Sequence, residues 1–378
     1  MYAWTDASEQ AGEAGLLRSM AIVHEGWQIA AGGYAANGAT RVDAVEPPAG
    51  WYTRLYSTSC GVFGLTSQSG TMTLERSTDG IQAFSTVLTT AAGRMSPALP
   101  LLIDCGSSRL VIVEYTTDNL PSYDNEARLW YSADGGDSWA LLLTSYAGAI
   151  RHFHGGFWDA RTERLFLFTG DSGDAASILV CDDLADLVAN AAQWRTWWGL
   201  TDAARSTLDT DYVLGYGSQQ LYRTVGMIAE GDYLLYGVDS YGPVGGVPMV
   251  RVHRDTLAVT ELEIPKHAAV ADVGKVVGEI WSYGRCARTG TVLIGNQAHD
   301  PGAPYQGDNH MHLYASTPGR IQEAREVLAM HDGGAVGVLC FSIEAVGDLT
   351  ILSPYFGSFD ALAGYVGQPT QSRNAWYK

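Results

Sequence analysis

The chain has 378 residues, of which 41 are acidic and 23 basic, so its formal net charge is −18. Such an acidic balance argues against nucleic-acid binding and against binding to a membrane surface, because both need a basic face. No apolar run approaches the roughly 18 residues of a spanning helix. Apolar residues make up 46% of the chain, enough for a packed core. We therefore expect a folded protein with no nucleic-acid and no membrane partner.

The N-terminus and the cysteines indicate where the chain is made. Residues 1–6 lack the basic-then-apolar pattern of a signal peptide. The five cysteines are odd in number, widely spaced and without a C-x-x-C pair, which favours buried small hydrophobes over a disulfide scaffold or a zinc ribbon. We expect cytoplasmic synthesis, with association with a virion or export without a classical signal left open.

The composition and a repeated hairpin predict the fold. The 44 Gly, 20 Tyr and 11 Trp are typical of short strands and tight turns. Two-strand patterns begin near residues 20, 98, 152, 225, 280 and 336. Six such units in 378 residues leave room for a four-stranded blade in each. The sequence therefore predicts an all-β fold: one domain over residues 1–378, a six-bladed β-propeller of four-stranded antiparallel blades.

One short amphipathic helix is expected as an insertion in the third blade. Its apolar positions follow the helical i, i+3, i+4, i+7 spacing after a candidate cap at Asp182: Leu184, Leu187, Val188, Ala191 and Trp194. We expect this helix to pack on the blade without a role at the site.

An eight-residue turn motif occurs twice. Ser132–Trp139 follows a strand and reads S-x-D-x-G-x-x-W, and Ser77–Phe84 keeps the Ser, Asp, Gly and aromatic positions. In such a turn the Asp and Ser side chains bind turn amides, Gly supplies a positive φ and the aromatic ring packs on the blade. We therefore assign structural roles to Asp79 and Asp134.

The two turn motifs, the hairpin repeat and a set of arginines that includes Arg18, Arg151 and Arg223 together resemble the sialidase-like (Asp-box, BNR repeat) β-propeller superfamily. The segment Leu17–Val23 is distantly similar to the motif that opens sialidases. The resemblance implies that Arg18 binds a carboxylate, with Arg151 or Arg223 as a further member of an arginine triad. The pattern R-H-x-H-G-x-x-x-D at 151–159 is also similar to uncharacterised propellers from bacterial polysaccharide loci and phage tails.

Propeller topology predicts which residues share a face. The starts of first strands and the ends of second strands meet around the axis, while the Asp-box turns lie on the opposite face. This placement gathers arginines, which bind planar carboxylates through paired hydrogen bonds. The site residues we expect are His152, His154, Asp171, Tyr222 and Asp239 for catalysis, and Arg18, Arg94, Arg151, Arg223 and His299 for substrate binding. In the alternative interpretation, each Arg pairs with an Asp to lock adjacent blades.

His152 and His154 are two residues apart on a predicted strand, so they share one face. Such a pair can carry a proton, contact substrate, bind a metal or form hydrogen bonds in the core. A second pair, His310 and His312, follows His299. We assign no metal ligand and no cofactor, and leave a divalent metal open.

Three functions fit this arrangement. The first is an enzyme that cleaves an acidic, uronate- or sialate-containing polysaccharide. It would be a hydrolase using Asp171 and Asp239, or a lyase in which Arg223 neutralises the carboxylate and a His or Tyr222 moves the proton. The second is a non-catalytic glycan-binding propeller, such as a phage receptor-binding or tail module. The third is a scaffold for protein partners. The expected partner is an acidic glycan, and an oligomer is left open.

Overall fold

The computed structural model describes the following residues: 4–6, 21–24, 27–30, 34–37, 40–43, 54–68, 71–78, 83–91, 101–115, 128–144, 152–170, 177–189, 222–239, 249–262, 280–285, 289–296, 310–321, 324–331, 338–346, 349–356 and 375–377. Most of them lie in strands. Within these ranges, no helix has the length and hydropathy that crossing a membrane requires.

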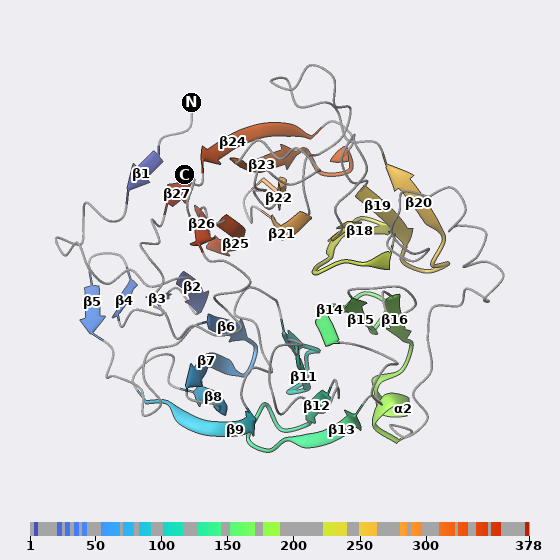
Figure 1. Cartoon of the computed structure of the whole chain (residues 1–378). Helices are drawn as coiled ribbons and strands as arrows, with labels where there is room; N and C mark the ends of the chain where they lie inside the picture. Colours follow the sequence, from blue (N-terminus) through green and yellow to red (C-terminus); the bar gives the residue numbers. More distant parts are fainter. Residues whose placement is uncertain are drawn as a thin grey trace.

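The strands form seven antiparallel sheets arranged as blades around a ring (Figure 1). Blade 1 consists of β2 (Ala21–His24), β3 (Trp27–Ala30), β4 (Tyr34–Asn37) and β5 (Thr40–Asp43). Blade 2 consists of β6 (Arg54–Thr58), β7 (Gly61–Gln68), β8 (Thr71–Ser77) and β9 (Ser85–Ala91). Blade 3 consists of β10 (Leu102–Asp104), β11 (Leu110–Val113), β12 (Arg128–Ser132) and β13 (Ala140–Thr144).

The other blades follow in chain order. Blade 4 has three strands within the described residues: β14 (His152–Asp159), β15 (Arg164–Gly170) and β16 (Ser177–Cys181). Blade 5 consists of β17 (Ile228–Glu230), β18 (Tyr233–Gly237), β19 (Met249–His253) and β20 (Val259–Leu262). Blade 6 consists of β21 (Ile280–Arg285), β22 (Val292–Asn296), β23 (His310–Ser316) and β24 (Arg325–His331).

Blade 7 closes the ring by combining both ends of the chain. It has the order β1 (Trp4–Asp6), β27 (Ala375–Tyr377), β26 (Leu349–Phe356) and β25 (Val338–Val346). The N-terminal strand β1 pairs antiparallel with the C-terminal strand β27. The inner strand of blade 1, β2, contacts both β6 and β25, so the first and last blades are neighbours. An edge strand from one end of the chain thus completes a sheet from the other.

The all-β propeller prediction is confirmed, but the count of six blades is wrong because the described strands form seven sheets. All six expected hairpins are present, and the missed one is β6–β7, which turns at Ser59–Cys60. Its turn carries neither Asn-Gly nor Asp-Gly, the usual hairpin signal, and the required positive φ falls on Gly61 at the start of β7. The motif copy at 77–84 lies between β8 and β9 of this blade.

The short inserted helix is also confirmed, as α2 (Leu184–Ala189) after β16. Its cap is one residue later than expected, because Asp183 Oδ1 accepts the Ala185 amide at 2.8 Å. Asp182 instead pairs with Arg164. Leu184, which is 3% exposed, joins the apolar core, whereas Val188 of the expected apolar stripe is 37% exposed. The helix follows the third strand of blade 4, which counts as the third blade only when the hairpin β6–β7 is missed, and Ala191 and Trp194 lie outside the described residues.

Apolar side chains between the blades form two core clusters, one across blades 2 to 4 and one across blades 4 to 6. Phe63 and Phe153 fill the first, and Phe166 and Tyr236 fill the second. The prediction of buried cysteines is confirmed for Cys105 and Cys181, and Cys60 is half-buried. Burial raises the pKa of Cys105 to about 12, which keeps it a neutral thiol.

The turn Ser132–Trp139 between β12 and β13 makes the contacts expected of its sequence. Ser132 Oγ donates to Asp134 Oδ1 at 2.8 Å and accepts the Gly136 amide at 2.7 Å. The Ser138 amide donates to Asp134 Oδ1 at 2.9 Å. Hydrogen bonds from Ser138 and from Ser132 hold the pKa of Asp134 well below its usual range. The Asp134 carboxylate therefore serves as a hydrogen-bond acceptor within the turn.

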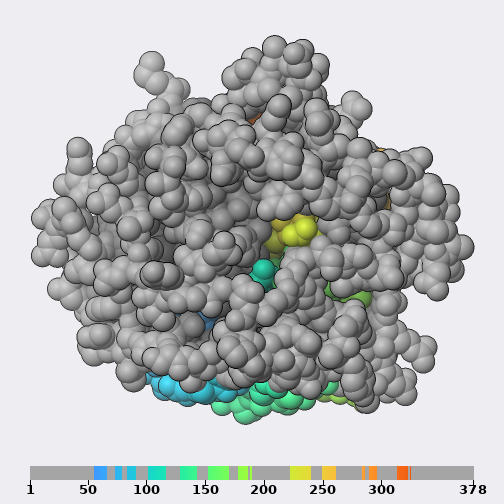
Figure 2. All heavy atoms as spheres, viewed as in Figure 1, coloured from blue at the N-terminus to red at the C-terminus, as the bar shows by residue number. Residues whose placement is uncertain are grey.

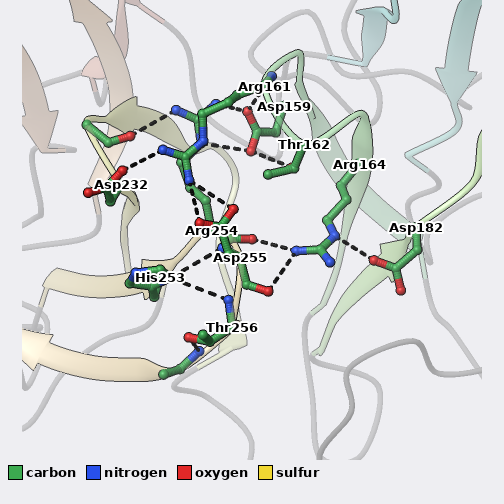
Figure 3. Close-up of polar contacts among 12 residues, drawn as sticks. Asp159, Arg161, Thr162, Arg164, Asp182, Asp232, His253, Arg254, Asp255 and Thr256 are labelled. Atoms are coloured by element: carbon green, nitrogen blue, oxygen red, sulfur yellow. Dashed lines mark hydrogen bonds and ion pairs between the residues drawn. The ribbon is translucent and has the colours of Figure 1, made fainter.

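Blades 4 and 5 are joined by a network of ion pairs at the end of β14 (Figure 3). Arg254 donates to both carboxylate oxygens of Asp159, with Nε 2.8 Å from Oδ2. Around this buried pair, Arg161 contacts the exposed Asp232 and Asp255. Arg and Asp thus join blades 4 and 5 here, but these are not the arginines of the alternative interpretation, which this network does not test.

Candidate functional site

The starting point of the site is the pair of histidines at the beginning of β14. His152 Nε2 and His154 Nε2 are 3.1 Å apart, and the two side chains are 1% and 2% exposed. Phe153, between them, packs into the first apolar cluster. The prediction that both histidines share a face is confirmed. His152 and Asp159 are the two ends of this eight-residue strand, at most about 23 Å apart, so the histidines and Asp159 lie toward opposite faces of the ring.

Asp239, from blade 5, completes the chain of contacts. It follows the end of β18 by two residues, and its Oδ2 is 3.2 Å from His154 Nδ1 and 3.3 Å from Arg223 Nε. The carboxylate is 1% exposed. The Asp239 amide also donates to the carbonyl of Arg223 at 2.7 Å. The end of one strand and the start of another therefore place an acid and a base in contact across a blade boundary, as the topology predicted.

The contacts decide which nitrogen of each imidazole carries hydrogen. His154 Nδ1 faces two acceptors, Asp239 Oδ2 at 3.2 Å and the Thr224 carbonyl at 3.3 Å, so it is the protonated nitrogen. In neutral His154 the lone pair is then on Nε2, and the hydrogen between the rings belongs to His152 Nε2. We name Asp239, His154 and His152, joined in this order, the Asp-His-His chain. A proton that His152 takes up can be shared along this chain.

A tyrosine that sequence analysis missed covers the histidines. The Tyr115 ring stacks on His152 with centroids 4.1 Å apart and lies 5.9 Å from His154. Tyr115 follows β11 of blade 3 and is 8% exposed. Tyr115 lies two residues beyond the end of a second strand, so the rule that the ends of second strands meet around the axis applies to it. The site therefore draws on blades 3, 4 and 5.

Of the remaining predicted site residues, only Tyr222 lies within the described part of the chain. Tyr222 is 3% exposed and belongs to the second apolar cluster. Five predicted residues lie outside the described part of the chain: Arg18, Arg94, Arg151, Asp171 and His299. Their roles remain predictions. His310 and His312 are on β23, but their side chains also lie outside the description.

The described residues contain no group of three or more His, Cys, Asp or Glu side chains that could hold a metal ion. In the Asp-His-His chain, both nitrogens of His154 are already engaged.

In the space-filling view, atoms in teal and yellow-green, the colours of residues 101–115 and 222–239, come to view near the centre of the face (Figure 2). The segments that carry Tyr115 and Asp239 thus reach the axis of the ring.

Comparisons with known proteins establish the fold. No family model and no curated protein matches the sequence. Among solved structures, a GH74 xyloglucanase from Xanthomonas campestris is similar with a TM-score of 0.56 and 13% identity, over 100% of this chain and 55% of that one. The chain thus spans about half the length of that enzyme.

Two further solved structures are similar over most of both chains. A candidate 6-phosphogluconolactonase from Bacteroides fragilis has a TM-score of 0.51 and 10% identity over 93% of each chain. YCF48 bound to D1 peptide has a TM-score of 0.49 and 11% identity over 100% of this chain and 94% of that one. At these identities the likeness concerns the fold alone. The seven sheets, together with the two similarities whose TM-scores exceed 0.5, show that the chain is a β-propeller.

Proposed function

We propose that this protein cleaves an acidic, uronate-containing polysaccharide by β-elimination at the Asp-His-His chain. The observation that carries the proposal is the unbroken line of contacts from Asp239 through His154 to His152, beside the cationic Arg223. Histidine titrates near neutral pH, so it suits a step that both removes and returns a proton. The ionised Asp239 fixes the tautomer of His154 and stabilises positive charge on the imidazole pair.

The proposed step uses these groups in a definite order. His152 takes the proton from the carbon that bears the uronate carboxylate. The electron pair left on that carbon forms a double bond to its neighbour, and the bond from this neighbour to the glycosidic oxygen breaks. The departing oxygen accepts a proton, for which the protonated histidine pair is a source. The products are an unsaturated uronate and a new reducing end.

Arg223 is the group we assign to the substrate carboxylate. Its side chain is 16% exposed, whereas His152, His154 and Asp239 are each 1% or 2% exposed. Arg223 is thus the most accessible of these four side chains. A guanidinium at the substrate carboxylate would stabilise the charge that develops when the adjacent proton leaves.

The surroundings of Asp239 favour elimination over hydrolysis. A hydrolase of the ordinary kind needs two carboxyl groups that face the scissile bond, one as acid and the other as nucleophile or base. Asp239 is 1% exposed and its Oδ2 contacts both His154 and Arg223. A carboxylate held in this way is suited to orienting a histidine rather than to attacking a sugar.

One observation favours a second function. His152 and His154 are almost completely shielded from solvent, which also fits a purely structural Asp-His-His chain below a non-catalytic glycan-binding surface. In such a binding module the histidines would fix the geometry of the central mouth. A bound glycan would then be released unchanged.

A depolymerisation screen separates these functions. Acidic polysaccharides are incubated with the wild type, with His154→Gln, and with His253→Gln as a control from the far face, where His253 Nδ1 accepts the Asp255 amide. In the wild type and in His253→Gln we expect new reducing ends together with enoyl-uronate absorbance. In His154→Gln the rate of cleavage should fall by about 10²-fold or more. Reducing ends without that absorbance would indicate a hydrolase. Glycan binding without products, equal in all three proteins, would indicate a binding module.

A further inference from the structure

A tyrosine of blade 6 contacts the blade 5 strand that leads to Asp239. The hydroxyl of Tyr283, on β21, accepts the Gly237 amide at 2.8 Å and donates to the Gly237 carbonyl at 3.3 Å. In the ring, β18 and β21 belong to neighbouring blades (Figure 1). A side chain thus takes up both hydrogen-bonding groups of one strand residue, as a neighbouring strand would.

The hydroxyl of Tyr283 acts at a point where the strand ladder has ended. At the C-terminal end of β18, the last residue paired with β17 is Leu235, opposite Ile228, so Gly237 lies beyond the ladder between these two strands. Gly226 makes room for the ring, since a Cβ there would lie 2.6 Å from Tyr283 Cδ2. The missing side chain of Gly226 is therefore what admits Tyr283 between the two chain segments.

Both segments that Tyr283 contacts carry an acceptor of His154. Gly237 precedes Asp239 by two residues, and Gly226 follows Thr224 by two residues. Thr224 Oγ1 donates to the Gly226 carbonyl at 2.9 Å and accepts its amide at 3.3 Å. The Thr224 carbonyl and the Asp239 carboxylate are the two acceptors of His154 Nδ1.

We infer that Tyr283 is a positioning residue, which holds Asp239 and the Thr224 carbonyl at His154 Nδ1 and so selects the tautomer of the Asp-His-His chain. Its effect on turnover rests on the proposed function, whereas its effect on the tautomer does not. Burial, partly offset by hydrogen bonds with Thr224 and Gly237, raises the pKa of Tyr283 far above its usual range. The hydroxyl therefore remains able to donate.

The test compares Tyr283→Phe with wild type in protein labelled with 15N at histidine. The nitrogen chemical shifts report which ring nitrogen carries hydrogen. In the wild type we expect a single Nδ1–H tautomer for His154, and in Tyr283→Phe a mixture of both tautomers. The ring is kept in this variant, so packing is preserved. With a cleavable substrate, we expect kcat to fall about tenfold or more while KM stays within about twofold, because the change misorients the base and leaves Arg223 in place.

Two further variants make the result specific. Gly226→Ala keeps the hydroxyl but displaces the ring, so it should give the same mixture of tautomers. Tyr233→Phe, at the other end of β18, removes the hydroxyl of a ring that packs against Arg251 and should leave the His154 signal unchanged.

The failure of this inference is distinguishable from the failure of the proposed function. An unchanged His154 tautomer in both Tyr283→Phe and Gly226→Ala would overturn the positioning role, whatever the wild type does to polysaccharides. A shifted tautomer in a protein that cleaves no substrate would support the positioning role and count against β-elimination.

Discussion

His154 and Asp239 belong to adjacent blades, and their side chains meet at 3.2 Å in a region where they are 2% and 1% exposed. Neither blade can form this contact alone, because β14 brings the imidazole and the end of β18 brings the carboxylate. A charged group at this depth needs partners, and Asp239 has both His154 and Arg223. The contact therefore couples assembly of the ring to assembly of the site.

Removal of the Asp239 carboxylate should affect both stability and turnover. In Asp239→Ala, Arg223 and His154 lose their buried counterpart, so we expect the free energy of unfolding to fall by about 3–5 kcal/mol in a urea titration. Asp239→Asn keeps the shape and one acceptor, and should cost less stability. Both variants should lower β-elimination by about 10²-fold or more. Full activity in Asp239→Asn would contradict the role of the carboxylate.

A side chain at Gly136 should destabilise the fold for two reasons: the Phe63 ring is too close, and the backbone has a positive φ. It has a φ of +96°, and a Cβ would lie 2.7 Å from the Phe63 ring of blade 2. Gly136→Ala should therefore lower the free energy of unfolding by more than the roughly 1–2 kcal/mol of left-handed strain. Gly319→Ala is the matched control, with a φ of +77° and nothing within 4 Å. Equal losses in the two variants would show that Phe63 moves away freely.

The Ser132 hydroxyl should stabilise the turn between β12 and β13. It is buried, and it accepts the Gly136 amide while donating to Asp134. Ser132→Ala leaves that buried amide without this acceptor, so we expect a loss of about 1–3 kcal/mol in chemical unfolding. Ser138→Ala, in the same turn but exposed, should cost less. A larger loss in Ser138→Ala would place the main support of the turn at Asp134 instead.

The buried pair of Asp159 and Arg254 should make stability depend on pH in the acidic range. Burial alone would raise the pKa of Asp159, but hydrogen bonds from Arg254, Thr162 and the Arg161 amide outweigh it and lower the pKa below its usual value. A carboxyl whose folded pKa is depressed stabilises the fold above its unfolded pKa of about 3.9. That contribution is lost as the pH falls through the lower, folded value.

The measurement for this pair is the free energy of unfolding of wild type and Asp159→Asn at several pH values. The difference should be largest near pH 7 and should shrink below about pH 4, where protonation removes the wild-type advantage. Arg161→Ala is the contrast, because its partners Asp232 and Asp255 are 69% and 61% exposed. Its effect should be small and should vanish at high salt. A pH-independent difference would contradict the assignment to Asp159.

The sequence by itself determined the local features of this protein. The hairpin patterns predicted the inner strands, because a period of two and a tight turn are settled by neighbouring residues. The hydrogen bonds of Ser132 and Asp134 form within one turn, so their motif was sufficient. The shared face of His152 and His154 follows from strand geometry alone.

The tertiary structure decided everything that depends on contacts between blades. The number of blades and the pairing of β1 with β27 follow from how the ring closes, which no single hairpin specifies. The partner of His154, the stacking of Tyr115 and the position of Tyr283 each depend on a neighbouring blade. Such contacts join segments far apart in the chain, and packing of whole sheets sets their distances. Turn chemistry therefore revealed the repeat, and only the closed ring shows which side chains meet at its axis.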